Sequence, residues 1–576
     1  MAEQGTDFQI TDARFLPVVS AYAERIGLVE RIDRLCDCDM EVSPGRVVLA
    51  MILDALSGRS PLFRLWEFFA DKDVELLLGD NIPLAKLSDY TLGRVLERLA
   101  DAGTHKILTA VVLGAMKVFQ LDLSHVHHDT TSHSLYGEYL LYDREDHDQP
   151  FVITNGFSKA HRPDLKQIVH SLLCVDHGIP IYSKLIDGNE SDKTINRNLI
   201  PEMVKRMKEL GRKDFIYVAD AALVTESNLA LIDDWDNGFL FVSRLPMNYN
   251  ECRDAISRAI DAQDWTEIGA LSMEPVSRNR KPAQYKAWET VVTLHEINYR
   301  GVVIHSDALD ERRQNKVSKQ IQKDREQLEQ LKKHVEKIEY ACAPDAQAAL
   351  KRIDPGALFH EVALWIEPKP IYQPGRPKAD GSRTLKTTRY GIKMEFRLHQ
   401  KAVETAREEA GCFVLLSNTL SEGEGSVPAK ELLTIYKDQH MVERNFGFLK
   451  DPVFVNALFL KSPRRIEALG LVLILALLIW RLMERTMRVN LAQNQRRVTG
   501  WVNRPTSRPT SFMMTTKFIG IYVLTSSEGR RLAKPLTPIQ IDYLNLLEVT
   551  PDVFTKPPAR ARRKKTICTE ITQNSS

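Results

Sequence analysis

The sequence lacks the marks of a secreted, disulfide-rich or membrane-spanning protein. It has only seven cysteines in 576 residues, an odd number without a CxxC pair, which excludes a disulfide framework and favours a reduced cytosolic setting. The start, MAEQGTDFQI, has no basic flank followed by an apolar core, so we expect no export signal. The longest apolar run, at 468–480, covers 13 residues, fewer than the roughly 18 that a membrane span requires, and predicts a buried helix.

An excess of one charge is also missing. The chain carries 78 basic and 76 acidic residues, a net charge of +2, so any affinity for nucleic acid has to come from local patches. The length predicts two to four domains.

The order of predicted elements indicates an α/β protein with a mixed sheet flanked by helices. Residues 1–115 predict a helical N-terminal domain, because serine–proline pairs at Ser43 and Ser60 precede apolar residues at helical spacing. Region 116–243 then predicts a first strand ending near Asp129, followed by a strand hairpin and by alternating helices and strands. The predicted hairpin joins 167–175 to 179–186, the helices cover 192–210 and 225–235, and the strands are 215–220 and 239–244.

The alternation of helices and strands stops after Arg244 for about 165 residues and resumes with a predicted buried strand at 412–419. Residues 244–410 are therefore interpreted as an insertion and 411–490 as the second part of the interrupted domain. Six apolar residues in the insertion fit a heptad pattern broken by Asp324 and predict a helical arm, either a single helix or a hairpin of two helices: Val317, Ile321, Leu328, Leu331, Val335 and Ile338. The stretch 376–401 has eight basic and two acidic residues, which suits either a solvated face or contact with phosphates. Residues 491–576 form a C-terminal region with a basic tail at 556–565.

The stretch SHVHHDTTSH at 124–133 raises the question of a metal site. On a strand, His125, His127 and Asp129 share one face, and this HxHxD spacing is known from zinc hydrolases. The alternative is that the histidines merely flank a strand end.

Asp129 and Asp220 each end a predicted buried strand, and the residues after them, Thr130–Thr131 and Ala221–Ala222, are interpreted as the exit of the chain from the sheet. If these strands are neighbours, two carboxylates converge at one sheet edge and repel each other unless a divalent cation neutralises them. Taken singly, each aspartate also fits a helix cap or a turn.

A third carboxylate is offered by a predicted helix at 430–450, followed by an apolar helix at 466–485. Tyr436, Glu443 and Lys450 are spaced seven apart and share one face with Gln439. A solvated stripe is the alternative.

The order Asp129, Asp220, Glu443, with the glutamate after a long insertion, resembles the DDE transposases of bacterial insertion sequences, specifically the IS-four superfamily. That family has a helix signature of Tyr, Arg, Glu and Lys, and this chain has Tyr436, Gln439, Glu443 and Lys450 at the same spacing, with glutamine in place of arginine. Segments 156–167, 187–194, 217–229 and 461–485 also look like the large-transposase branch of this family.

The resemblance implies an RNase H-like catalytic domain in which Asp129, Asp220 and Glu443 bind two Mg²⁺ ions, with Mn²⁺ as an expected substitute. It implies cleavage of double-stranded DNA at transposon ends and strand transfer into target DNA, by a cytoplasmic homodimer of a bacterium or archaeon in a synaptic complex. The expected DNA contacts, beside Tyr436, Gln439 and Lys450, are Lys159, Arg162 and a base-stacking Trp288.

Two other functions remain open from the sequence. One is a zinc-dependent hydrolase that uses His125, His127 and Asp129. The other is a noncatalytic DNA-binding protein descended from a transposase.

Overall fold

The computed structural model describes residues 8–37, 39–57, 64–135, 149–157, 162–233, 239–271, 282–307, 311–377, 381–450 and 462–558. The chain forms two compact units. The first consists of residues 1–242 and 435–576, and the second of residues 243–434. The predicted return to the first fold at 411 therefore differs from the observed division, which falls between Thr434 and Ile435.

The N-terminal part of the first unit is helical, as the sequence predicts. The helices are α1 (Leu16–Arg25), α2 (Leu28–Cys36), α3 (Pro44–Ser57), α4 (Leu65–Phe69), α5 (Val74–Leu78), α6 (Asp89–Ala102) and α7 (Thr104–Phe119). Two of its helices begin at capping side chains: Ser88 accepts a hydrogen bond from the Thr91 amide at the start of α6, and Asp73 accepts one from the Leu76 amide at the start of α5. One strand was not foreseen, β1 (Gln9–Asp12), which pairs antiparallel with β16 (Tyr522–Ser526).

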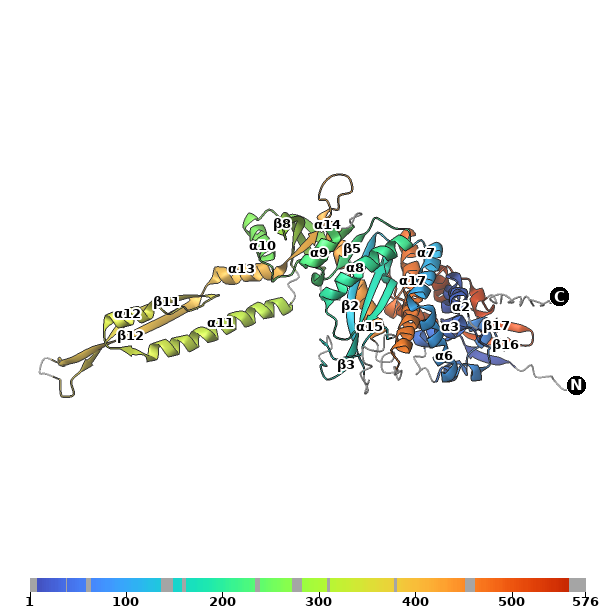
Figure 1. The fold of residues 1–576 in the computed structure, drawn as a ribbon, viewed down its shortest axis with the longest axis horizontal. Helices are drawn as coiled ribbons and strands as arrows, with labels where there is room; N and C mark the ends of the chain where they lie inside the picture. Colours follow the sequence, from blue (N-terminus) through green and yellow to red (C-terminus); the bar gives the residue numbers. More distant parts are fainter. Residues whose placement is uncertain are drawn as a thin grey trace, which may run out of the picture. The chain divides into compact units, whose positions relative to one another are not determined.

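The apolar run lies inside helix α17 (Pro463–Gln493), which packs against α3, α6 and α7 (Figure 1). Its 31 residues are long and apolar enough to cross a membrane by length and composition, and 78% of its most apolar window is buried inside the structure. Buried leucine, isoleucine and valine side chains on every side of the helix stabilise this part of the unit by the hydrophobic effect. The predicted buried helix is confirmed, and it is longer than expected.

The sheet of the first unit has the strand order β4-β3-β2-β5-β6. Strands β2, β3 and β4 are antiparallel neighbours, whereas β2 and β5 run parallel. The bounds are β2 (His125–Leu135), β3 (Lys166–Val175), β4 (Ile179–Ile186), β5 (Ile216–Ala219) and β6 (Leu240–Arg244), with helices α8 (Asp192–Glu209) and α9 (Glu226–Asp233) between the later strands. A mixed sheet with helices on it is thus what the alternation predicts.

The predicted end of the first strand near Asp129 is wrong. Strand β2 continues to Leu135, because β3 pairs with it from His127 as far as Leu135. The β-branched Thr130 and Thr131, interpreted from sequence as the exit from the sheet, are buried members of the strand.

In the second unit the strand order is β13-β9-β8-β7, and neighbouring strands in this order are antiparallel. The strands are β7 (Thr266–Ala270), β8 (Gln284–Leu294), β9 (Ile297–Ser306) and β13 (Cys412–Ser417), with helix α10 (Asn250–Ala262) packed against β8 and β13. All six residues of β13 are buried, so the predicted strand at 412–419 is confirmed.

The helical arm of the second unit exists, but its partner is a β-hairpin rather than a second helix (Figure 1). Helix α11 (Glu311–Lys337) packs against β12 and against α13 (Gln400–Gly411). Val317, Leu328 and Val335 of the heptad pattern are buried, while Ile338 is exposed. The hairpin strands are β11 (His360–Tyr372) and β12 (Leu385–Leu398), flanked by α12 (Ala343–Leu350) and β10 (Glu339–Tyr340).

The described part of the C-terminal region, residues 491–558, contains short helices and strands. It contains β14 (Val498–Thr499), β15 (Pro505–Thr506), α18 (Ser511–Lys517), β17 (Gly529–Leu532) and α19 (Pro538–Leu546), which begins with a capping box of Thr537 and Gln540. Of the basic tail, only Lys556, Pro557 and Pro558 lie within the described residues.

Candidate functional site

Asp129 and Asp220 occupy equivalent positions on two neighbouring parallel strands. The last paired residues of β2 and β5 are His127 and Val218, and each aspartate follows two residues later. Asp220 follows the carboxyl end of β5, whereas Asp129 lies within β2, which continues to Leu135; both side chains are half-buried. The two strands are therefore parallel neighbours, the condition under which the sequence predicts that the two carboxylates converge.

Each aspartate also makes a local hydrogen bond. Oδ1 of Asp129 accepts from the Thr130 amide at 2.7 Å. Oδ1 of Asp220 accepts from the Ala222 amide at 3.1 Å, so Asp220 caps the short turn Ala221–Leu223. Asp220 thus has the turn-capping role that an isolated aspartate suggests, and this hydrogen bond holds its carboxylate at the end of β5.

The predicted helix at 430–450 is broken into α14 (Ala429–Lys437) and α15 (His440–Leu449). At the break, the amides of Gln439, Met441 and Val442 bond to carbonyls three residues back instead of four. The imidazole of His440 bonds the Lys437 carbonyl at 2.8 Å. Tyr436 therefore lies on a different helix from Glu443, and the single stripe inferred from seven-residue spacing is wrong for Tyr436.

The break places Gln439 against the sheet. Its Nε2 donates to the backbone carbonyl of His128 at 3.2 Å, so the start of α15 docks on the peptide that precedes Asp129. Glu443 is one helical turn further along α15 and shares this face. Gln439, which stands where the family signature has arginine, therefore binds a backbone carbonyl of the protein itself.

Helix α15 lies over the same face of β2 as Asp129. Nδ2 of Asn445 donates to Sγ of Cys174 at 3.1 Å, and Cys174 is the cross-strand partner of His127. His127 and Asp129 are two residues apart and point to the same face of β2.

Residues at the two ends of α15 act on different histidines of β2. Burial, with His125 and His440, lowers the pKa of His127 to about 3, and burial, with His170 and Lys450, lowers the pKa of His133 well below its usual value.

Within the described parts of the chain, no three or more His, Cys, Asp and Glu side chains form a group that could hold a metal ion. This applies equally to His125, His127 and Asp129 and to the three predicted carboxylates. Glu443 is exposed on α15. Asp129, Asp220 and Glu443 thus lie on β2, at the end of β5 and on α15, and β2 contacts both β5 and α15, but the three carboxylates do not form a metal-binding group in this structure.

His128 has a structural role that favours the plain interpretation of the histidine stretch. One ring nitrogen lies 3.2 Å from Oδ1 of Asn196 and the other 3.0 Å from Oγ of Ser171, and the ring stacks on Tyr217. Tyr217 also donates to Oδ1 of Asn196 at 3.1 Å. This buried network joins β2, β3 and β5 to α8 on the face opposite Asp129.

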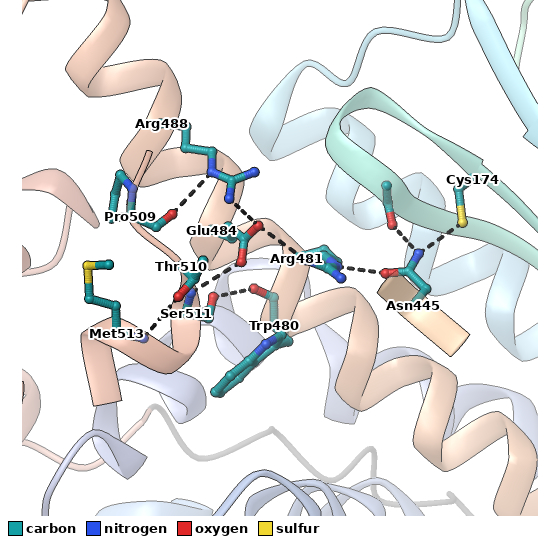
Figure 2. Close-up of polar contacts among 11 residues, drawn as sticks. Cys174, Asn445, Trp480, Arg481, Glu484, Arg488, Pro509, Thr510, Ser511 and Met513 are labelled. Atoms are coloured by element: carbon teal, nitrogen blue, oxygen red, sulfur yellow. Dashed lines mark hydrogen bonds and ion pairs between the residues drawn. The ribbon is translucent and has the colours of Figure 1, made fainter. Parts of the chain in front are cut away.

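A second buried network holds α15 against the fold (Figure 2). Nδ2 of Asn445 donates to the Gly178 carbonyl at 2.7 Å, and its Oδ1 accepts from Nε of Arg481 at 2.6 Å. Arg481 and Arg488 both pair with Glu484, at 3.1 and 2.7 Å, and Glu484 accepts from the Ser511 amide of α18. We did not predict this network, whose only signal in the sequence is the helical spacing of Arg481, Glu484 and Arg488 inside the apolar α17.

The remaining residues predicted to contact DNA are Arg162, Lys159, Trp288 and Lys450. Arg162 pairs with Asp164, its near neighbour, at 2.6 Å, and Lys159 lies outside the described residues. Trp288 on β8 is half-buried, with the Arg258 guanidinium 5.9 Å from its ring centre. Lys450 caps the end of α15.

Residues 8–113 match the family model of a domain of unknown function, DUF4277. Among similar solved structures is a cryo-EM structure of a piggyBac transposase synaptic complex with hairpin DNA, at 8% sequence identity and a TM-score of 0.35, covering 89% of this chain and 82% of that chain. A TM-score at this level does not establish a common fold. No curated protein matches the sequence.

Proposed function

We propose that the protein is a DDE transposase that cleaves DNA at transposon ends and transfers the strand into target DNA. The observation that carries the proposal is the register of β2 and β5, which sets Asp129 and Asp220 at equal distances beyond the last paired residues, beneath the helix that bears Glu443. The domain matched by residues 8–113 is found in transposase-like proteins, which favours the same class.

The strand order supports an RNase H-like interpretation of the first unit. Such a sheet has three antiparallel strands followed by strands parallel to the first, with acidic residues on the first and fourth strands. In the order β4-β3-β2-β5-β6, strands β2, β3 and β4 are antiparallel and β5 is parallel to β2, with Asp129 on β2 and Asp220 after β5, which supports this interpretation. Membership of the IS-four superfamily remains part of the proposal and rests on the sequence signature.

The donor set suits a hard divalent cation, because carboxylate oxygens are the ligands that Mg²⁺ and Mn²⁺ prefer. Asp129 and Asp220 would hold it, and Glu443 would complete the set through its long, exposed side chain. Two bound Mg²⁺ ions would supply activation of the attacking oxygen and stabilisation of the leaving oxygen in an in-line displacement.

Hydrogen bonds within the protein position Asp220 and the helix that carries Glu443. Asp220 is held at the strand end by the turn that it caps, and α15 is held over Asp129 by Gln439 and Asn445. Lys450 at the end of α15 would attract a backbone phosphate as a point charge. The partners proposed with this activity are double-stranded transposon ends and target DNA, bound by a homodimer in the bacterial or archaeal cytoplasm.

The test is cleavage of DNA that carries the element's ends, with DNA binding measured in parallel. We expect Asp220→Asn to lower the cleavage rate at least a thousandfold and to leave the dissociation constant for DNA within about twofold. Asp214→Asn, an exposed aspartate just before β5, is the matched control and should behave as wild type.

The same experiment distinguishes the alternatives. Binding without cleavage by the wild-type protein, in both Mg²⁺ and Mn²⁺, would point to a noncatalytic DNA-binding descendant and contradict the proposal. Tightly bound stoichiometric zinc in the purified protein would point to the hydrolase that uses His125 and His127.

A further inference from the structure

The tip of the β11–β12 hairpin is an exposed, basic surface of the second unit. Every described residue from Ile371 to Thr387 is exposed. The described stretches 371–377 and 381–387 contain three basic residues and no acidic residue, a net charge of +3. We define the arm tip as residues 371–377 and 381–387.

The cations of the hairpin differ between its body and its tip. In the body, Lys369 and Arg389 lie 3.3 and 3.4 Å from Glu339, and Arg397 lies 2.6 Å from Glu361. At the tip, no carboxylate of the described residues pairs with Arg376, Arg383 or Lys386. The basic excess noted at 376–401 is therefore compensated in the body and uncompensated at the tip.

The tip also departs from a regular ribbon. Ile371 pairs with Thr387 and Tyr372 with Leu385, so Lys386 is the extra residue of a β-bulge. A bulge increases the right-handed twist of a ribbon and turns a side chain outwards. Tyr372, at 45% exposure, and Leu385, at 52%, provide apolar surface beside the cations.

A second copy of the chain is the less suitable occupant of this surface. Two tips of charge +3 repel each other. Strand addition at the edge of β11 is opposed by Pro368 and Pro370, because proline removes the backbone donors that a new strand would need. A two-stranded ribbon of this kind fits the major groove of double-stranded DNA, and its cations match the phosphate charge.

We propose that the arm tip is a DNA-contacting surface, separate from the carboxylate site, in which Arg376, Arg383 and Lys386 contact backbone phosphates of duplex DNA. The choice of DNA as the partner rests on the proposed function. The contact itself is independent of cleavage, so binding can be tested without metal.

The test measures the affinity of the full-length protein for a fluorescent duplex of about 30 base pairs and arbitrary sequence, over a series of salt concentrations in EDTA. The triple variant Arg376→Gln, Arg383→Gln, Lys386→Gln should bind at least about tenfold more weakly at low salt. Its slope of log affinity against log salt should be smaller by about 2.7, since each phosphate contact contributes about 0.9.

Two control proteins sharpen the result. The variant Lys117→Gln, Lys205→Gln, Lys213→Gln removes three exposed cations of the first unit and should keep the wild-type slope. The charge-preserving variant Arg376→Lys, Arg383→Lys, Lys386→Arg should restore most of the slope. Melting curves of all variants should match wild type, because the substituted side chains are exposed.

An unchanged slope in the arm-tip variant would overturn the proposal, and so would an equal decrease in the first-unit control. A change in sedimentation from dimer to monomer with DNA binding intact would overturn it in favour of a contact between copies. Absence of DNA binding by the wild-type protein would instead count against the proposed function.

Discussion

Nε of Arg481 donates to Oδ1 of Asn445 at 2.6 Å and thereby joins the apolar helix α17 to the helix that carries Glu443. Both residues are buried, and Asn445 satisfies its remaining donors on Cys174 and on the turn after β3. Since Glu443 is two residues from Asn445, the geometry of the candidate site depends on this contact.

Replacing Asn445 by leucine should lower stability strongly. The change leaves the Gly178 carbonyl and a guanidinium nitrogen of Arg481 buried without a partner, at a cost of about 2–4 kcal/mol. The measurement is the urea midpoint of unfolding, with Asn494→Ala at the exposed end of α17 as the control, where the expected loss is under about 0.5 kcal/mol. Equal midpoints for both variants would show that the network does not hold α15.

Acid should weaken the fold through the buried pair His133 and His170, whose rings lie 3.3 Å apart between nitrogens. Burial lowers the pKa of His170 to about 4, and burial, with His170 and Lys450, lowers that of His133 well below its usual value. Above about pH 7.5 both histidines are neutral in the folded and in the unfolded chain, so their contribution to stability does not change with pH. As the pH falls towards 4, only the unfolded chain takes up these protons, so stability decreases by up to about 1.4 kcal/mol per pH unit and histidine.

Urea midpoints between pH 7.5 and pH 4.5 check this dependence. His170→Gln should flatten the decline, whereas His334→Gln on the exposed face of α11 should leave it unchanged. A decline of the same steepness in both variants would assign the acid sensitivity to other groups.

Gln439 offers a way to separate docking from DNA contact. If its amide holds α15 on the His128 carbonyl, Gln439→Ala should cost about 1 kcal/mol of stability and reduce the cleavage rate, with an unchanged salt dependence of DNA binding. A lower salt slope with unchanged stability would restore the role that the sequence signature suggested.

Asp324 anchors the arm where the heptad pattern fails. It is buried and accepts from the Phe359 amide and the His360 imidazole, both at 2.8 Å. Burial raises its pKa, but these hydrogen bonds outweigh burial and the net shift is downward. Asp324→Ala should therefore increase hydrogen exchange at the start of β11 by about tenfold or more, since a buried charged hydrogen bond contributes roughly 1.5–3 kcal/mol. Asp345→Ala, at an exposed aspartate of α12, should leave exchange there unchanged.

Much of the first unit could be predicted because local patterns dominate there. Apolar runs bounded by turn residues gave β3, β4, β5 and β6, and the serine–proline pair at Ser43 gave the start of α3. The second such pair, at Ser60, lies outside the described residues. The length of β2 could not be predicted, because its polar second half is stabilised by pairing with β3 rather than by its own composition.

Of the two strand ends predicted at the candidate site, only the end of β5 before Asp220 is observed, whereas β2 continues past Asp129 because it pairs with β3. The parallel pairing of β2 with β5 sets the two aspartates at equivalent positions. The break before His440 and the Arg481–Asn445 contact depend on residues distant in sequence, as does the β-hairpin that replaces a second helix beside α11. Periodicity specifies which face of an element is apolar but not which element covers it.

The central claim is that Asp129, Asp220 and Glu443 act together on divalent cations. Its most direct test is Mn²⁺ binding to the full-length protein, followed by electron paramagnetic resonance, which needs no knowledge of the transposon ends. The account predicts that Asp129→Asn, Asp220→Asn and Glu443→Gln each weaken Mn²⁺ binding at least tenfold, whereas Asp214→Asn leaves it unchanged. Wild-type Mn²⁺ binding in all three variants would contradict it.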